Sequence, residues 1–574
     1  MILQALHEYY QRKSADPGAG LAPPGFELKE IPFIIVIDGE GRLVQIDDMR
    51  EGQGKKRRAK IQLVPKSVKR SVDVRANLLC DTVEWVLGVS TRGKPERVRQ
   101  QHEAFRDKLI EVFGSAPMDP GLKAVFAFLG RLGEHDFTAS PAWNELREMS
   151  PFVTFRLAGD SHLVTQRPHV RQQIEGRGGP PADGVCLVTG LDDVIEVTHP
   201  SIKGVRDAQP FGANIVSFNL DAFSSFGKEQ GLNAPVGKKA AMAYTTALNH
   251  LLGRDSRQRM QVGDATTVFW AEKSSGATVE QAFAAWFDPR QDDPDANVER
   301  IRALYEFKKG TPLTDDDDQR FYVLGLAPNK ARIVIRFWQV ATVREMGERI
   351  FRHFSDLEIA RSPFDPQYPS LYRLLLGLAP PTRDADKLKG LQPRLPGDWM
   401  RAILAGSPYP HGLLQAALRR CRALRDVDYV RAALIKACLN RSSFRKEVKL
   451  AVSLDSDNTN TGYRLGRLFA TFEKIQEEAN PGINATIRDR YFGAASSNPL
   501  VVFPLLNRLK NHHLAKIANP GRVVNLERVI GAIMEGLDAA RPFPPSLTLA
   551  DQGRFAVGYY HQRQKFFEKI GGTQ

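Results

Sequence analysis

The chain has 574 residues, of which 42% are hydrophobic and 25% are charged, a composition typical of soluble globular proteins with several structural units. No run of about 18 apolar residues occurs, which argues against a membrane span. Four scattered cysteines without a CxxC pair argue against disulfides and a structural zinc site. We therefore expect a cytoplasmic protein that has no metal, no other cofactor and no membrane partner.

The net charge of +14 is concentrated in two parts of the chain. From residue 401 to the last residue there are 26 lysines and arginines against 14 acidic residues, whereas the preceding 400 residues have 54 against 52. A second cluster lies between residues 51 and 75, with nine basic residues and two acidic ones. Such clusters attract nucleic acids, although a solvated surface without a partner has the same composition.

The first part of the chain alternates between helix and strand signals. Residues 1–12 have apolar side chains at helical spacing, and residues 31–37 (IPFIIVI) predict a buried strand. The turn at 38–41 and the apolar residues after it predict a β-hairpin. Glycines and prolines in residues 176–184 predict a surface loop before a strand at 185–190 (VCLVTG).

The middle of the chain combines acidic loops with a second hairpin. Acidic, proline-containing residues 288–295 and 311–318 predict exposed loops on either side of a helix at 298–307 (VERIRALYEF). Residues 321–338 (FYVLGLAPNKARIVIRFW) predict a hairpin around Pro328. The apolar residues expected on one side of its second strand are Ile333, Ile335 and Phe337.

Helices dominate from there on. Thr342 and Glu345 form a capping-box pattern, which predicts the start of a helix with Val343, Met346, Ile350 and Phe354 facing inward. The proline-rich residues 379–398 predict the main domain boundary. Two later helices show one apolar stripe each, and we expect their basic residues to lie on the outer surface of a helical bundle. The stripes are Leu465, Leu468, Phe469, Phe472 and Ile475, and Leu505, Leu506, Leu509 and Leu514.

Together these elements predict an α+β fold, in which a mixed N-terminal region of hairpins and helices is followed by an all-α C-terminal helical bundle. We divide the chain into four regions. They are a mixed region with the basic segment (1–175), a strand and loop block (176–260), a hairpin-plus-helix region that ends in the proline-rich linker (261–395) and the basic helical bundle (396–574).

Sequence motifs of common enzymes are missing. The chain has no GxSxG, HExxH, paired CxxC, Walker loop or Rossmann glycine pattern. Gly227-Lys228 is not a phosphate loop, because Glu229 stands where that motif needs Ser or Thr. A metal-dependent nucleic-acid hydrolase remains one alternative, with carboxylates of Asp136 and Asp315–Asp318 brought together only in the fold. We expect these acids to lie in solvated loops instead.

The block from His199 to Gly237 (HPSIKGVRDAQPFGANIVSFNLDAFSSFGKEQGLNAPVG) is rich in amides, hydroxyls, lysines and glycines. Asn and Gln amides pair with adenine edges, lysines with guanine or phosphate, and serines with phosphate oxygens. The same residue types are also common in ordinary structural loops. Composition alone therefore leaves both interpretations open.

The chain resembles the large subunit of type I-C CRISPR interference complexes, known as Cascade. The segments that carry this resemblance run in the family's order from Met1 to about Lys516 and cover nearly the whole chain. They are MILQALHEYY with APPGF near the start, RANLLCDTVEWVLG, the block from HPSIKGV to NAPVG, FYVLGLAPNKARIVIRFW, and SPYPHGLLQAALRR followed by NPGINATIRDRYFGAASSNP.

The resemblance implies a non-catalytic subunit of an RNA-guided surveillance complex. Such a subunit recognises the protospacer-adjacent motif in target DNA, promotes duplex opening and R-loop formation, and serves antiviral defence. The implied partners are a guide CRISPR RNA, the double-stranded target DNA, the displaced single strand, the backbone, guide-processing and small subunits, and a recruited helicase-nuclease. The C-terminal part resembles the small subunit, which family members also make from an internal start, here near Val448 or Val452.

Within this interpretation we expect the loop from Asn214 to Asn233 to read the flanking DNA motif. Basic residues in the segment 51–75 and in the helical bundle are expected to contact nucleic-acid backbones. A purely architectural RNA-binding subunit is the other alternative. The candidate motif-reading residues are Asn214, Asn219, Ser224, Lys228, Gln230 and Asn233, and the backbone-contacting candidates are Lys55, Lys56, Arg57, Arg58, Lys66, Lys69, Arg70, Arg464, Arg467, Arg488, Arg490, Arg508 and Lys510.

Overall fold

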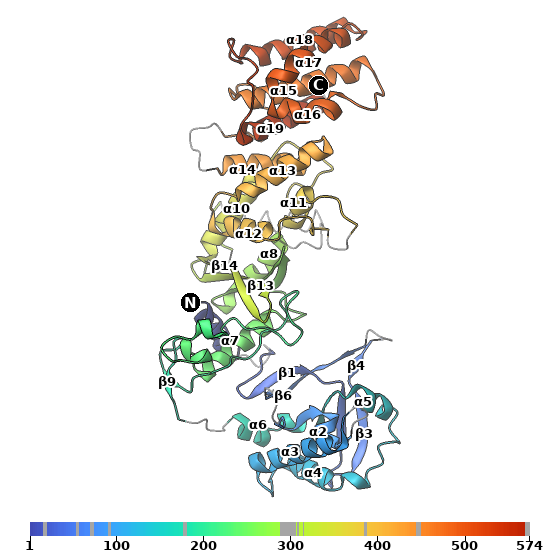
Figure 1. Ribbon diagram of the computed structural model, residues 1–574, viewed down its shortest axis with the longest axis vertical. Coiled ribbons are helices and arrows are strands. Elements are labelled where there is room, and N and C mark those ends of the chain that lie inside the picture. The colour runs from blue at the N-terminus through green and yellow to red at the C-terminus, as the bar shows by residue number, and fades with distance from the viewer. Residues whose placement is uncertain are drawn as a thin grey trace. The chain divides into compact units, whose positions relative to one another are not determined.

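The structure, a computed structural model, combines strands and helices in its first half with a helical second half (Figure 1). This arrangement confirms the predicted α+β class. Contacts divide the chain into two compact units: unit 1 comprises 1–201 and 216–250, and unit 2 comprises 202–215 and 251–574. The described residues are 1–14, 20–52, 57–68, 74–89, 93–175, 181–287, 306, 309–313, 315–383, 387–442 and 449–568.

Unit 1 is built around a four-stranded sheet with the order β3-β2-β8-β7. The predicted hairpin is confirmed, because β2 (Phe33–Ile37) pairs antiparallel with β3 (Leu43–Asp48). On its other side β2 pairs parallel with β8 (Phe152–Leu157), which pairs antiparallel with β7 (Cys80–Thr82). All five residues of β2 are buried, as expected for a central strand with an uninterrupted apolar run.

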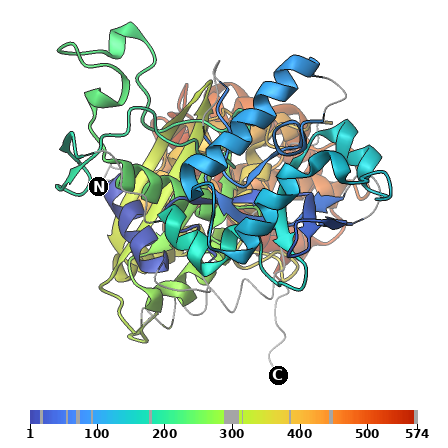
Figure 2. The ribbon, with the colours of Figure 1, turned by 90° about the horizontal axis from the view of Figure 1, so that it is seen from below.

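Helices and two short ribbons complete unit 1 (Figure 2, where α3 is the long blue helix). The predicted first helix is confirmed as α1 (Ile2–Ser14). α4 packs on β2 and β8, and α3 packs on α2. The other elements are α2 (Val83–Leu87), α3 (Pro95–Phe113), α4 (Pro120–Gly130), α5 (Trp143–Met149), α6 (Pro168–Glu175), and the ribbons of β1 (Phe26–Glu30) with β6 (Ile61–Pro65) and β4 (Arg50–Glu51) with β5 (Arg58–Ala59). α7 (Lys238–Leu251) ends where unit 2 resumes.

Unit 2 contains an antiparallel sheet of β11 (Arg259–Val262), β12 (Ala265–Ala271), β13 (Arg320–Asn329) and β14 (Arg332–Thr342). The second predicted hairpin is therefore confirmed. Its strict alternation is wrong at one place: Ile333 and Phe337 are buried, but Ile335 is 38% exposed. The register shift opposite Gly325/Leu326 is a β-bulge that interrupts the period of two, so Ile335 and Phe337 do not share a face of the sheet.

Helices continue the core of unit 2 from this sheet to the end of the described chain. The predicted capping box is confirmed at the start of α10 (Val343–Leu357), whose four predicted inward residues are buried. Leu391 and Leu395 are buried in the same core, so the proline-rich residues 379–398 lie within unit 2. The remaining helices are α8 (Ala277–Phe287), α11 (Leu371–Leu378), α12 (Leu395–Ala405), α13 (His411–Leu424), α14 (Tyr429–Asn440), α15 (Thr461–Ala479), α16 (Ile487–Ser497), α17 (Pro499–Leu514), α18 (Pro520–Glu535) and α19 (Leu549–Phe567).

The last five helices form a bundle, drawn in orange to red in Figure 1, with α15 at its centre. α15 contacts α16, α17, α18 and α19, and all five residues of its predicted apolar stripe are buried. α15 and α19 approach closely because glycines face each other's backbone. A Cβ at Gly466 would lie 2.0 Å from the Phe555 carbonyl oxygen, and one at Gly558 would lie 2.2 Å from that of Tyr463.

Two elements predicted from the sequence are not confirmed. The predicted helix at 298–307 lies outside the described residues except for Glu306. The predicted strand at 185–190 is wrong in extent, because β9 comprises only Gly184–Val185 and a turn follows. Among the described residues, no helix combines the length and the apolar character needed to cross a membrane. The division into four regions stays a prediction.

Candidate nucleic-acid interface

Residues 219–233 of unit 1, called the reading loop below, are held by several backbone contacts. β9 pairs with β10 (Asp192–Asp193), and Ile195 forms a bridge with Gly237. The Gly231 N–H donates to the Val197 carbonyl oxygen over 3.0 Å. Gly231 has no room for a side chain, since a Cβ would lie 2.4 Å from the Glu196 carbonyl oxygen. The base of the segment 221–233 is therefore closely packed against residues 196–197.

Asn233 holds the end of this segment from inside. Its Oδ1 accepts a hydrogen bond from the Ser225 N–H (2.9 Å), and its Nδ2 donates to the carbonyl oxygens of Lys228 (2.9 Å) and Gln230 (3.0 Å). The amide thus satisfies three backbone groups of its own loop. The sequence predicts that Asn233 reads DNA bases, whereas the structure uses both ends of its amide to shape the loop.

The outermost part of the loop is the turn Ser225–Lys228. The Lys228 N–H donates to the Ser225 carbonyl oxygen over 3.0 Å. Phe226, at the centre of this turn, is 97% exposed. Phe226 is not among the residues predicted from the sequence, where the signal is an aromatic residue directly before a glycine in a polar loop. Four predicted reading residues lie exposed on the same segment or close to it: Asn219, Ser224, Lys228 and Gln230.

Asn214 belongs to unit 2, whereas the other candidate reading residues belong to unit 1. Its backbone pairs with the start of β14: the Asn214 carbonyl oxygen accepts from the Ile333 N–H over 3.0 Å. The predicted reading loop from Asn214 to Asn233 therefore includes residues of both units, and its role stays a prediction. Pairing between residues more than 100 positions apart in the sequence determines the place of Asn214.

The basic segment 51–75 contains both paired and exposed cations. Arg57 donates to Asp48 over 2.5 Å, and Arg50 joins Asp48 to Glu145. The hydrogen bond from Arg50 is the main reason that the pKa of Asp48 falls to about 2. Arg58 is exposed and Lys66 is partly buried. Four other candidates in this segment lie outside the described residues: Lys55, Lys56, Lys69 and Arg70.

Two arginines of α15 occupy positions that the sequence analysis predicted wrongly. Arg464 and Arg467 are only 7% and 5% exposed, not on the outer surface. Arg464 Nε donates to the Asn458 carbonyl oxygen (2.6 Å), and Arg467 Nη1 donates to that of Ser456 (3.1 Å). Because α15 is surrounded by four helices, both faces beside its apolar stripe are covered. These arginines stabilise the bundle and are unavailable to a nucleic acid.

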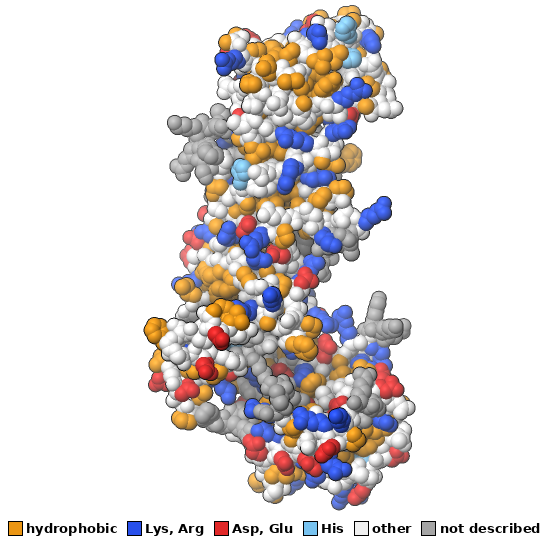
Figure 3. All heavy atoms as spheres, in the orientation of Figure 1, with side chains coloured by type: hydrophobic (Ala, Val, Ile, Leu, Met, Phe, Trp, Pro, Cys, Tyr) orange, Lys and Arg blue, Asp and Glu red, His pale blue; other side chains and the backbone are white. Residues whose placement is uncertain are grey.

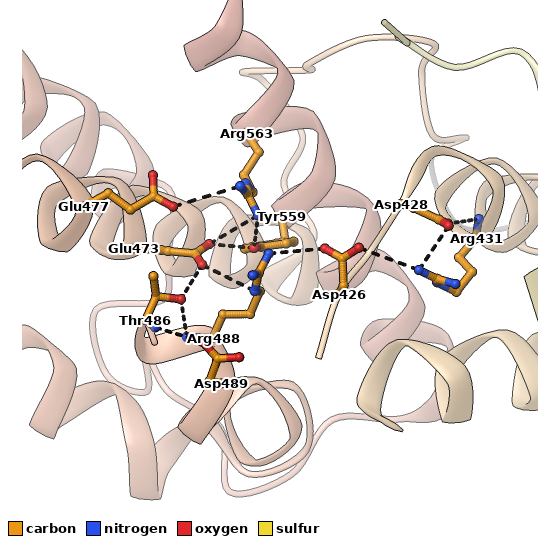
Figure 4. A network of polar contacts seen from close by, with 10 residues as sticks. All are labelled: Asp426, Asp428, Arg431, Glu473, Glu477, Thr486, Arg488, Asp489, Tyr559 and Arg563. Atoms are coloured by element: carbon orange, nitrogen blue, oxygen red, sulfur yellow. Dashed lines mark hydrogen bonds and ion pairs between the residues drawn. The ribbon is translucent and has the colours of Figure 1, made fainter. Parts of the chain in front are cut away.

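Arg488 belongs to a polar network that joins four parts of unit 2 (Figure 4). It lies 3.2 Å from Asp426, before α14, and 3.6 Å from Glu473 of α15. Tyr559 of α19 donates to Glu473 over 2.5 Å, and Arg563 lies 3.8 Å from the same carboxylate. Glu473 is only 2% exposed. The charge of Arg488 is therefore largely compensated by carboxylates of its own chain.

Exposed cations nevertheless occur on several helices of unit 2. Among the predicted residues, Arg490 and Arg508 are exposed and Lys510 is partly exposed. α13 and the turn after it add Arg419, Arg422 and Arg425 at a spacing of three residues, all exposed and all missed by the sequence analysis. Figure 3 shows lysine and arginine side chains over α13 and near α16 on the face drawn. This surface suits the backbone of a nucleic acid.

The carboxylates considered for hydrolysis do not converge in the described structure. Asp316 pairs with Lys273 (2.6 Å), Asp318 with Arg344 (3.3 Å), and Asp136 accepts from the Thr138 N–H (2.9 Å). The described residues contain no group of three His, Cys, Asp or Glu side chains arranged to hold a metal ion. Asp317 is buried, not solvated as expected, and accepts a hydrogen bond from the Leu313 N–H.

Comparison with known proteins gives one extended match. The family model described as CRISPR-associated protein (Cas_Csd1) matches residues 6–567. A comparison with curated proteins found no match. The family match includes both units, the reading loop and the basic helices.

Proposed function

The chain belongs to the Cas_Csd1 family of CRISPR-associated proteins, the large subunits of type I-C Cascade, and on this premise we propose that it recognises a short flanking motif in target DNA. In this proposal the guide RNA reads the target sequence by base pairing, while the protein reads the protospacer-adjacent motif and promotes duplex opening and R-loop formation. The single observation that carries the proposal is the match over residues 6–567.

The reading loop supplies the chemistry for base recognition. Asn219 and Gln230 carry exposed amides, and Lys228 carries an exposed ammonium group. One well-placed contact of this type discriminates between base pairs by about 1–3 kcal/mol, so two or three contacts suffice for a short motif. Asn233 acts as a positioning residue, because its three internal hydrogen bonds hold the backbone from which Lys228 and Gln230 project.

Nucleic-acid backbones are the proposed partners of the exposed cations. We assign Arg58 to phosphates of the target duplex or of the guide, and Arg419, Arg422, Arg490 and Arg508 to a single strand. The paired Arg57 and Arg488 contribute less, because a phosphate must compete with Asp48 or with Asp426 and Glu473. The guide RNA, the target DNA and the displaced strand are partners in this proposal.

We further propose that the subunit contributes no bond-breaking step. The support is that Asp136, Asp316 and Asp318 are engaged by Thr138, Lys273 and Arg344. Incubation of the purified chain with magnesium or manganese and with labelled DNA or RNA tests this directly. Cleavage that disappears in an Asp316→Asn or Asp318→Asn variant would favour the hydrolase instead.

The function as a whole is tested in the assembled complex with a guide RNA. Binding is measured for duplex targets with the preferred flanking motif and with an altered motif. The proposal predicts at least tenfold discrimination by the wild-type complex. It also predicts a smaller ratio for Lys228→Ala and Gln230→Ala. A purely architectural subunit would give equal binding to both targets.

A further inference from the structure

A bulky aromatic residue occupies a turn position that favours glycine or asparagine. In the turn Ser225–Lys228, φ is 53° at Phe226 and 69° at Gly227. Both central residues therefore have the left-handed backbone typical of a type I′ turn. Phenylalanine is strained there, because its Cβ crowds the backbone and it has no short polar group to compensate.

The strain at Phe226 is not offset by packing. The side chain is 97% exposed, so its ring buries almost no apolar surface within the chain. Phe364 is exposed to the same degree, at 96%, but has no positive φ. A residue that is both strained and unpacked contributes nothing evident to folding, and this combination indicates a functional role.

The backbone around Phe226 is held firmly enough to present the ring in one place. Asn233 bonds to the backbone on both sides of Phe226, at the Ser225 N–H and the Lys228 carbonyl oxygen. Gly231 fixes the base of the loop against the carbonyl groups of Glu196 and Val197. An exposed ring on such a turn is preorganised for contact with a flat partner.

We propose that Phe226 stacks on a nucleobase beside the flanking motif. Charge alone gives this loop little attraction for a polyanion, because exposed Glu229 directly follows Lys228. Stacking of an aromatic side chain on a base supplies the missing attraction, since every base offers an apolar face. The inference rests on the proposed function and names the residue through which the loop grips DNA.

The test uses the assembled complex with its guide RNA, and compares Phe226→Ala, Phe226→Trp and Phe226→Leu. Phe364→Ala is the matched control, because it removes an equally exposed ring from another loop. Affinity for a target with the preferred motif should fall about 5- to 150-fold in Phe226→Ala, the range of one base-stacking contact. Phe226→Trp should retain wild-type affinity, Phe226→Leu should lose most of it, and Phe364→Ala should match wild type.

A second readout locates the base. Single abasic sites are placed in turn at each nucleotide beside the motif. At one position the abasic target should weaken wild-type binding as much as Phe226→Ala does, and should not weaken that variant further, because ring and base belong to one contact. Additive losses at every position would overturn the proposal.

Two further outcomes separate the alternatives. Phe226→Gly should fold with an unchanged or higher melting temperature, since glycine tolerates the positive φ, yet should bind DNA as weakly as Phe226→Ala. If Phe226→Ala instead releases a protein subunit from the complex and Phe226→Leu retains it, the ring anchors a protein, and the proposal is overturned. If wild type discriminates between motifs and Phe226→Ala binds equally well, the stacking inference fails while the proposed function stands.

Discussion

The Nδ2 of Asn233 donates a 2.9 Å hydrogen bond to the carbonyl oxygen of Lys228, so the residue that shapes the turn is distinct from the residue that projects from it. In the reading loop, Asn233 therefore holds the backbone in shape, while the side chain of Lys228 is exposed for recognition. Substitutions of the two residues should have different consequences.

Replacing Asn233 should loosen the loop. In Asn233→Ala the Ser225 N–H loses its acceptor, and two carbonyl groups lose their donor. Loss of these bonds should lower the free energy of opening the loop by about 1–2 kcal/mol. The Ser225 amide hydrogen should then exchange about 5- to 30-fold faster. Hydrogen exchange measures this effect. Asn233→Asp is the matched control, because it keeps the acceptor for Ser225. Equal protection of this amide in wild type and Asn233→Ala would contradict the assigned role.

Buried and exposed arginines of the bundle should respond oppositely to substitution. Arg490→Gln with Arg508→Gln should lower the logarithmic salt dependence of DNA binding by roughly one unit per lost phosphate contact. Melting temperature should stay unchanged, because both side chains are exposed. Arg464→Gln with Arg467→Gln should lower the stability of the bundle by about 2–4 kcal/mol, since buried carbonyl groups lose charged donors. If the Arg464/Arg467 variant instead lowered the salt dependence and kept its stability, this result would show that the buried pair contacts the nucleic acid.

The carboxylate of Glu473 should matter more for stability than a more accessible carboxylate on the same helix. Glu473 is 2% exposed and faces Arg488, Arg563 and Tyr559 (Figure 4). Glu473→Gln removes the buried carboxylate that Arg488 and Arg563 share, although Asp426 and Glu477 remain beside them, and breaking a buried pair costs about 3–5 kcal/mol at most. Glu478→Gln is the control, because Glu478 and its partner Arg522 are both more accessible than Glu473, so loss of this pair should cost less. The unfolding midpoints of the two full-length variants decide the point, and similar midpoints would contradict the prediction.

A buried histidine should make the bundle less stable in acid. Burial, assisted by the positive charge of Lys436, lowers the pKa of His561 to about 4. In the unfolded chain His561 therefore binds a proton once the pH falls below about 6.5, whereas in the folded chain it binds the proton only near pH 4. Between these limits stability falls with falling pH, by up to about 3 kcal/mol. His561→Gln, which stays neutral, should flatten this dependence in thermal unfolding between pH 4 and 6.5. An unchanged slope would exclude His561 as its source.

Local patterns in the sequence predicted much of the fold correctly. Both hairpins, the capping box at Thr342 and the apolar stripe of α15 follow from alternation, turn residues and helical spacing. These features depend on neighbours within a few residues. The register shift between Ile335 and Phe337 depends on the partner strand, so the residue pattern of β14 alone does not predict it.

The candidate site was less predictable, because exposure depends on distant elements. Arg464 and Arg467 lie off the apolar stripe of α15, yet four surrounding helices bury them. Asn214 pairs with the start of β14, far away in the sequence, and this contact assigns it to unit 2. The prominence of Phe226 arises from its backbone conformation, which residue type alone does not indicate.

The most direct test of the account is motif discrimination by the assembled complex. Dissociation constants are measured for targets with the preferred and the altered flanking motif, using wild type and Lys228→Ala. The account predicts that wild type binds the preferred target at least tenfold more tightly, and that Lys228→Ala reduces this ratio severalfold. Equal binding of both targets by the wild-type complex would contradict the central claim.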